Sequence, residues 1–458
     1  MRITLLACAV VAATFMVVGN AVAQNQWMVS RTAFENYYEA GSETPRGEDN
    51  VASPSDVAGS CDDGAEADCG CEKNNCCCFA WGTDWSINVG AGIRTSYNAI
   101  EFGNPANGGT RQDFNLNNAR IYLNGQGHER IGFEFNTDIN NAQGFMDNHN
   151  GNPFGTTELG EMRILDAIVK FDMGCNTHVW FGRLLPPSDR SNLSGPFYLN
   201  AWNFPFVQLG YANIFQGRDD GVVLWGERDC GRIKWSIGLF DGENLGGRDV
   251  AGQPGVDNLE VAARLTVNLL DPEPGYYNSS TYYGEKDILA IGLAVQHRSA
   301  AVDTADSTNW NLDVLFEKPL GNCGVLTLEG AYYEYNDNGG LHPATTAAAP
   351  REITNPVTGG SRQGESYFIL GSYLLPREVC LAGYAGKWQV MGRYQEYSHD
   401  FQDVGAGFDA DQWDLQLNYI MFGHDARLSA VWSQLDNSGL TRVGGVSNTF
   451  TLGAQVQF

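Results

Sequence analysis

Short runs in which apolar and polar residues alternate dominate the chain. In the final run, NTFTLGAQVQF (448–458), the aromatic and aliphatic residues from Phe450 to Phe458 occupy the even positions, and Thr, Gly and Gln occupy the odd ones. A period of two is the mark of a β-strand with one apolar face. Because this face continues to Phe458, the pattern predicts that the last strand is paired and packed against an apolar environment.

The same alternation recurs from Trp81 to the end of the sequence, interrupted by connections rich in Gly, Asn, Asp and Pro. Clear examples are WSINVGAGIRTSY (85–97), NLEVAARLTVNL (258–269) and QWDLQLNYI (412–420). The pattern predicts sixteen strands, centred near residues 90, 120, 134, 167, 181, 223, 236, 263, 292, 314, 328, 370, 391, 416, 429 and 454.

The connections between these runs alternate in length. Those after even-numbered strands are mostly short, such as QGHER, DMGCNT and FGHD, and those after odd-numbered strands are mostly longer. The longest extend from Leu184 to Gly217 and from Asp337 to Glu365. Short turns on one side and long loops on the other are typical of outer-membrane barrels.

A soluble β-sandwich also alternates apolar and polar residues, so periodicity alone leaves both folds open. Three features favour a membrane barrel: apolar faces of about 9–11 residues, aromatic residues near strand ends, and an export signal. Strands in lipid must close into a ring, because every backbone polar group needs an internal partner. We therefore predict an all-β, closed antiparallel transmembrane barrel over residues 81–458.

Charge and composition narrow the function. The 458 residues include 28 Lys and Arg against 54 Asp and Glu, a formal net charge of −26. This balance argues against a nucleic-acid partner, which requires basic patches. With 55 Gly and 12% aromatic residues, the composition suits a turn-rich β protein. The mean hydropathy of −0.28 does not fit a bundle of membrane helices.

The N-terminus has the parts of a secretory signal peptide, residues 1–23. Arg2 is the basic region, 5–18 the apolar region, and Ala21-Val22-Ala23 a small-residue cleavage site. The alternatives are an uncleaved anchor, for which the apolar run is short, and a lipoprotein site at Cys8, which comes early. Residues 24–80 form an acidic, Cys-rich segment that we expect to be a flexible periplasmic extension. The expected location is the outer membrane.

Ten cysteines follow the predicted signal. The cluster before the first strand contains Cys61, Cys69, Cys71, Cys76, Cys77 and Cys78. Four more fall in even-numbered connections: Cys175, Cys230, Cys323 and Cys380. All are expected on one oxidising side, which favours disulfides, and a metal site is the alternative. We hypothesise that some cross-links tether the N-terminal segment to the turns.

Charged residues of both signs lie on the predicted polar faces. The pore-lining candidates are Arg94, Arg120, Glu134, Asp166, Lys170, Arg183, Arg264, Arg298, Asp313, Arg393, Asp414 and Arg427. A ring of side chains with the same charge would select ions. Because the signs here are mixed, the alternative is the wall of a water-filled lumen in which opposite charges pair across neighbouring strands. Within the 184–217 connection and at its end, Arg190 and Arg218 are candidates for a loop folded into the pore, or else for an outer loop packed on its neighbours.

Several segments resemble the phosphate-selective porin O and P family. The resemblance rests on NLNNARIYLNGQGHERIGFEFNTDI, LDAIVKFDMGCNTHVWFGRLLPP, RDDGVVLWGERDCGRIKWSIGLFDG, WQVMGRYQEYSHD and DLQLNYIMFGHDARLSAVW. It covers roughly residues 81–458 and implies a sixteen-stranded outer-membrane barrel, usually trimeric, whose third outer loop folds inward. Phosphate-selective members use a basic ladder, and this acidic chain has few basic residues in the corresponding loop.

The expected function is therefore a passive diffusion channel for small hydrophilic solutes or ions, with outer-membrane lipid and the solutes as its partners. No Ser/His/Asp grouping or HExxH motif points to catalysis, and we expect neither cofactor nor metal. The competing interpretation is a barrel that anchors the envelope or displays loops and conducts little.

Overall fold

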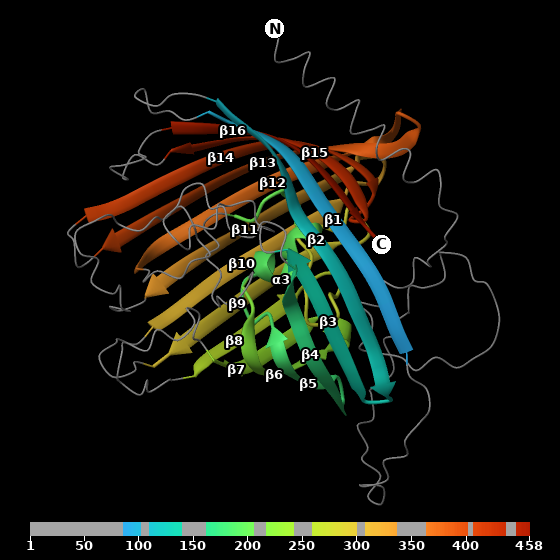
Figure 1. Cartoon of the computed structure of the whole chain (residues 1–458), viewed down its shortest axis with the longest axis vertical. Coiled ribbons are helices and arrows are strands. Elements are labelled where there is room, and N and C mark those ends of the chain that lie inside the picture. Colours follow the sequence, from blue (N-terminus) through green and yellow to red (C-terminus); the bar gives the residue numbers. More distant parts are fainter. Residues whose placement is uncertain are drawn as a thin grey trace, which may run out of the picture.

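Sixteen antiparallel strands form a closed ring in which neighbours in sequence are neighbours in space (Figure 1). The computed structural model describes residues 86–101, 110–139, 162–205, 217–241, 259–299, 307–336, 363–401, 406–436 and 446–458. The strands are β1 (Ser86–Glu101), β2 (Thr110–His128), β3 (Ile131–Ile139), β4 (Met162–Gly174), β5 (Thr177–Leu184), β6 (Asp219–Arg228), β7 (Ile233–Phe240), β8 (Glu260–Asn268), β9 (Ile288–Arg298), β10 (Ser307–Pro319), β11 (Val325–Asn336), β12 (Gln363–Leu381), β13 (Tyr384–Phe401), β14 (Ala406–Phe422), β15 (Ala426–Asp436) and β16 (Val446–Gln457). Every predicted strand centre falls in its strand, so the predicted fold is confirmed.

The ring closes through β1 and β16. Phe458 donates its backbone N–H to the carbonyl of Ala91 at 3.0 Å, and Ala91 donates to the carbonyl of Phe458 at 2.9 Å. From Gly92↔Gln457 to Glu101↔Asn448 the two strands pair residue by residue. A closed sheet leaves no unpaired strand edge, as a β-structure in hydrocarbon requires. The expectation that the final strand pairs with the first is confirmed.

Alternation sorts the side chains between two environments. On the outer wall, large apolar residues are exposed, as at Val89, Leu265 and Leu415. On the inner wall, polar residues such as Asn311, Gln395 and Asn418 are fully buried. This arrangement inverts that of a water-soluble protein and fits a barrel with hydrocarbon outside. Of the helices in the described ranges, none has the length and apolar character of a membrane span.

Aromatic pairs lie on the outer wall near the strand ends. Trp310 packs beside Tyr332, with 5.5 Å between ring centroids, and Tyr394 packs beside Trp413 at 4.7 Å. These pairs lie toward the end of the barrel that carries the long connections, which we call the loop end. Amphipathic rings favour the boundary between hydrocarbon and water, so the pairs mark one edge of the apolar band.

At the opposite end, which we call the turn end, several strand pairs are joined by tight turns. The β4–β5 turn places Cys175 and Asn176 at φ 52° and 53°, and the β12–β13 turn places Ala382 and Gly383 at φ 51° and 92°. Positive φ at both central residues gives the turn type whose twist matches paired strands. The turns therefore fix strand register at this end.

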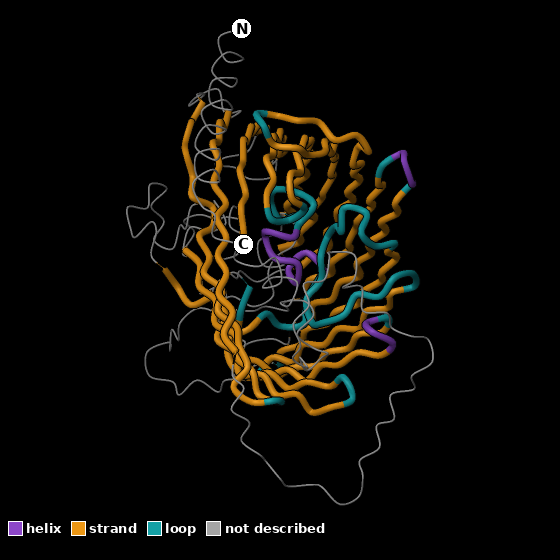
Figure 2. Tube along the Cα trace, turned by 90° about the vertical axis from the view of Figure 1, so that its right-hand side faces the viewer, coloured by secondary structure: helices purple, strands orange, loops and turns teal. Residues whose placement is uncertain are grey.

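Two segments outside the strands lie inside the ring (Figure 2). The first follows β5 and contains α3 (Arg190–Tyr198); residues 185–205 are hereafter the inner loop. The second, residues 269–287, joins β8 to β9 and is hereafter the inner turn. The inner loop was one of two predicted alternatives. The inner turn departs from the general expectation that even-numbered connections are short.

Candidate functional site

The inner loop enters the lumen after β5 and turns into α3 through a side-chain cap. Asp189 accepts hydrogen bonds from the backbone N–H groups of Ser191 at 3.0 Å and Asn192 at 3.3 Å. Such caps satisfy the otherwise unpaired first N–H groups of a helix. The hydroxyl of Tyr333 on β11 donates to the same carboxylate at 3.0 Å. The helix start is therefore attached to the far wall as well as capped.

Side chains of the wall bind the backbone carbonyls of the inner loop. The contacts are Gln296 to Pro187, Arg264 to Ser188, Gln455 to Phe197, Arg427 to Leu199, Asn200 and Ala201, Arg94 to Trp202, and Arg393 to Asn203. Non-helical backbone inside a barrel needs hydrogen-bond partners, because an unpaired buried carbonyl costs several kcal/mol in an apolar medium, about 2–7 by transfer measurements. The wall arginines therefore fix the path of the loop.

Trp202 is the aromatic anchor of the loop. The guanidinium of Arg94 lies 4.1 Å from the indole centroid and that of Arg427 lies 5.8 Å from it. Arg120 approaches the neighbouring ring of Phe197 at 5.6 Å. Desolvated cation–π contacts contribute about 2 kcal/mol each in favourable cases. This part of the wall, formed by β1, β2 and β15, thus combines positive charge with loop aromatics.

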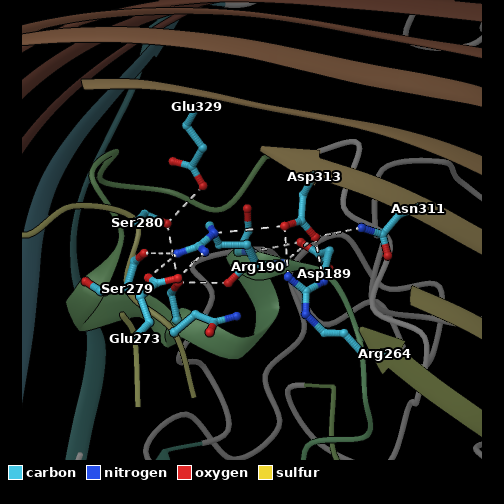
Figure 3. Close-up of polar contacts among 12 residues, drawn as sticks. Asp189, Arg190, Arg264, Glu273, Ser279, Ser280, Asn311, Asp313 and Glu329 are labelled. Carbon is cyan, nitrogen blue, oxygen red and sulfur yellow. Dashed lines mark hydrogen bonds and ion pairs between the residues drawn. The ribbon is translucent and has the colours of Figure 1, made fainter. Parts of the chain in front are cut away.

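Arg190 lies at the centre of a buried ionic cluster (Figure 3). Its guanidinium donates to both carboxylate oxygens of Glu273 on the inner turn, at 2.8 and 2.7 Å, and to the carbonyl of Ser279 at 2.7 Å. Its backbone N–H donates to Asp313 on β10 at 3.2 Å. Arg190 and Glu273 are each 1% exposed. This residue therefore joins the inner loop to the inner turn and to the wall.

A second part of the cluster lies on β8 and β10. Arg264 donates to both oxygens of Asp313 at 2.6 and 2.8 Å, and Asn311 donates to the same carboxylate at 3.0 Å. Charge-assisted bidentate pairs of this kind are the strong members of their class. Because Asp313 also binds the backbone of Arg190, the pair supports the start of α3.

Four further ion pairs lie on the inner wall or next to it. The pairs are Arg120–Asp138 at 2.6 Å, Lys170–Glu134 at 2.5 Å, Arg218–Asp166 at 2.9 Å and Arg393–Asp414 at 2.8 Å. The first, second and fourth join neighbouring strands, and Arg218 lies where the chain returns from the loop to β6. Each of these four pairs is neutral, whereas Arg94 and Arg427 bind loop carbonyls.

The pKa values of two buried carboxyls, one in the inner loop and one in the inner turn, are shifted in opposite directions. Burial raises the pKa of Asp189 to about 6, and the nearby charge of Asp313 acts in the same direction. Burial also opposes ionisation of Glu273, but the charge and hydrogen bonds of Arg190 outweigh it and lower the pKa of Glu273 to about 2. Glu273 is therefore ionised at neutral pH and forms a true ion pair with Arg190.

The structure brings most of the candidate charges to the inner wall, with two differences. Arg183 lies on the outward row with Phe181 and pairs with Asp220 at 2.8 Å, so it does not belong to the lumen-facing candidates. Gly182, with φ 124°, precedes it near the end of β5. Arg298 follows the inward row of β9 but is exposed at the loop end. The constriction-loop candidates Arg190 and Arg218 are both buried in the interior.

The four turn cysteines lie at the turn end of the barrel, the side predicted from their positions after even-numbered strands. Cys230 is disulfide-bonded, and Cys323 and Cys380 are exposed thiols in the structure. The cluster Cys61–Cys78 and the predicted signal peptide lie outside the described residues. The pairing of the N-terminal cluster with the turns therefore stays a prediction.

The sequence interpretation missed the contribution of the inner turn. Glu273, Tyr276 and Tyr277 were not candidates, and neither was His424, which lies in the β14–β15 turn. The sequence did mark this segment. The connection DPEPGYYNSSTYYGEK (271–286) is far longer than the other connections after even-numbered strands, and it contains four tyrosines. A solvent-exposed turn has no need of such a concentration of aromatic residues.

Comparisons with known proteins define the fold class. No protein-family model matches the chain, and no curated protein matches it in sequence. Among solved structures, OprB of Pseudomonas putida matches with a TM-score of 0.50 and 10% identity, over 82% of this chain and 94% of its own. Salmonella typhi OmpF in complex with daunomycin matches with a TM-score of 0.50 and 8% identity, over 81% and 97%.

The anion-selective porin from Comamonas acidovorans matches with 15% identity and a TM-score of 0.49, over 82% of this chain and all of its own. At these identities the likeness concerns the fold. The chain therefore has the closed, sixteen-stranded barrel architecture that is found in porins.

Proposed function

We propose that this protein is an outer-membrane porin, a passive channel through which small hydrophilic solutes or ions move down their gradients. The observation that carries the proposal is the inner loop inside a closed barrel, held by polar wall side chains while the outer wall is apolar. A loop held inside the barrel narrows the lumen and leaves the ring of strands intact. The likeness of the fold to OprB and OmpF supports this proposal.

We further propose that ion selectivity is weak. In the described part of the lumen, basic side chains either face a carboxylate, as Arg264 faces Asp313, or bind loop carbonyls, as Arg427 does. A solute therefore meets few free charges of one sign. For this reason the resemblance to the phosphate-selective O and P family is proposed to extend to the barrel architecture and not to phosphate specificity.

Export by a cleaved signal peptide and assembly as a homotrimer complete the proposal, the trimer being implied by the family resemblance. Intact-mass measurement of the mature protein tests the first. Mass determination of the detergent-solubilised complex tests the second. A mature chain that retains residues 1–23, or a strictly monomeric complex, would contradict the respective statement.

Conductance in planar bilayers tests the channel itself. Refolded protein is expected to give stepwise current increases, with a reversal potential near zero in a salt gradient. Protein denatured by heat is the matched control and gives none. The competing function, an anchoring or display barrel, is favoured by how densely the inner loop and inner turn fill the interior, and it predicts no steps at any voltage.

A further inference from the structure

The inner turn occupies the lumen in the same way as the inner loop. Its residues Asn278, Ser280 and Thr281 are at most 1% exposed, although all three are polar. Wall side chains satisfy its backbone: Lys234 binds the carbonyl of Tyr277 at 3.1 Å, and Glu317 accepts from the backbone N–H of Gly284 at 2.8 Å. A turn that merely joined β8 to β9 would need none of these contacts.

The inner turn crosses the barrel interior. It leaves between β8 and β9, and its Thr281 carbonyl lies 2.9 Å from Nε2 of His424 in the β14–β15 turn. The ring of His424 also packs against Tyr283 of the inner turn and Tyr198 of the inner loop, with centroids 4.8 and 4.7 Å apart. Since β14 and β8 are separated by several strands of the ring, the segment bridges distant parts of the wall.

Contacts between the two inner segments are direct. Ser280 donates its backbone N–H to the carbonyl of Tyr198 at 3.1 Å, and Tyr276 donates its hydroxyl to the carbonyl of Leu185 at 2.8 Å. Along the chain of the inner loop, the Arg190–Glu273 ion pair lies between these two contacts. The two segments therefore form one structure, made from one connection at each end of the barrel.

We propose that residues 269–287 form a second constriction of the pore, which narrows its turn end. Through the buried Glu273, this segment also cancels the charge that Arg190 would otherwise impose on the lumen. This inference rests on the proposed channel function. It assigns to the inner turn a share of both pore size and ion preference, which the inner loop would otherwise set alone.

The structure indicates how the inner turn can be removed. Strand pairing continues past β8 and β9, because Leu269 donates its N–H to the carbonyl of Leu289 and Asp271 donates to that of Asp287, both at 2.8 Å. Residues 272–286 can therefore be replaced by Asn-Gly, a two-residue turn suited to paired strands. We expect this shortened barrel to show a single-channel conductance larger by roughly two-fold or more, because conductance follows the narrowest part of a pore.

A point substitution tests the charge. Glu273→Gln keeps the size of the side chain and removes one negative charge from the cluster. Arg190 and Arg264 then share the single carboxylate of Asp313, so the reversal potential in a salt gradient should shift toward anion preference. The matched control is Glu365→Gln, because Glu365 lies on the outer wall against Tyr332 and should shift nothing.

The outcomes separate the two proposals. If native and shortened barrels conduct equally, the second constriction is wrong while the channel function stands. If neither conducts, both proposals fail. If the shortened chain does not fold, Glu273→Gln decides: unchanged conductance together with an unchanged reversal potential overturns the inference.

Discussion

The indole ring of Trp202 lies directly against Gly453 of β16. A Cβ atom added at Gly453 would lie 2.5 Å from the ring, a distance that real Cβ contacts do not reach. The glycine thus provides the space in which the loop aromatic meets the wall, between Arg94 and Arg427. Wall and loop are fitted to each other at this point.

Replacing Gly453 with Ala should displace Trp202 and loosen the inner loop. Overpacking of this kind costs about 1–3 kcal/mol, to be measured as the unfolding free energy of the refolded barrel in urea. Gly371→Ala is the matched control, because its added Cβ would meet only Leu328 at an ordinary 3.5 Å. Equal stability of the two variants would contradict the packing described here.

Breaking the Arg190–Glu273 pair from one side should be more harmful than removing it altogether. Arg190→Met leaves a buried carboxylate without its partner, a change that typically costs about 3–5 kcal/mol. The double variant Arg190→Met with Glu273→Gln should recover part of that loss. A double-mutant cycle on unfolding free energies measures the coupling, and strictly additive effects would show that the pair does not act as a unit.

Asp411→Asn should stabilise the barrel. On the outer wall Asp411 of β14 lies directly opposite Glu396 of β13 on one side and Asp436 of β15 on the other. Like charges directly opposite destabilise a sheet by roughly 0.2–1 kcal/mol per pair. The gain should appear as a higher unfolding temperature at low ionic strength and shrink at about 1 M salt, where screening is strong. A loss of stability at low salt would disprove the repulsion.

Acidification should weaken the contact between inner turn and inner loop. Burial lowers the pKa of His424 to about 4, and the charge of Arg427 acts in the same direction. Since the unfolded chain binds the proton near pH 6.5, stability is fully present above that pH and is lost as pH falls toward 4, by at most about 3 kcal/mol. The raised pKa of Asp189 adds stability as pH falls below about 6, in the native chain and in His424→Gln alike. The measurement is therefore the difference in unfolding free energy between the two chains, which should change in favour of His424→Gln as pH falls from 6.5 to 4. Below pH 4.5, protonation of Glu273 should add a separate loss.

Peptide mapping should find Cys230 in a disulfide in protein isolated without reductant. The partner is expected among the N-terminal cysteines Cys61–Cys78, because oxidising conditions and a shared side of the membrane favour that pairing. Reduction should release the linked peptide. Recovery of Cys230 as a free thiol, under conditions that trap thiols at once, would disprove the cross-link.

Much of the fold could be predicted because a barrel wall obeys a local rule. Alternation alone placed residues such as Val261 outside and Arg264 inside, and the closed ring followed from hydrogen-bond satisfaction in lipid. Arg183 follows the same rule, because it lies two residues after the exposed Phe181 and therefore on the outward face. Its charge suggested the lumen, but it lies at the end of its strand, where a polar residue is tolerated on either face.

The contacts inside the barrel could be predicted less well, because they do not follow the two-residue alternation of the strands. Arg190 and Glu273 are separated by 83 positions in the chain, and no local pattern announces that they meet. The alternation could show that Arg94 and Arg427 face inward, but not that they bind main-chain carbonyls instead of lining open water.

That preference for carbonyls has an evolutionary consequence. A carbonyl is present at every residue type, so these hydrogen bonds fix the course of the inner loop without specifying the side chains at positions such as Pro187, Leu199 and Asn203. Substitutions at such positions can therefore change which solutes pass, while the barrel wall continues to hold the loop backbone in the same place. The same wall could accept engineered loops of different selectivity.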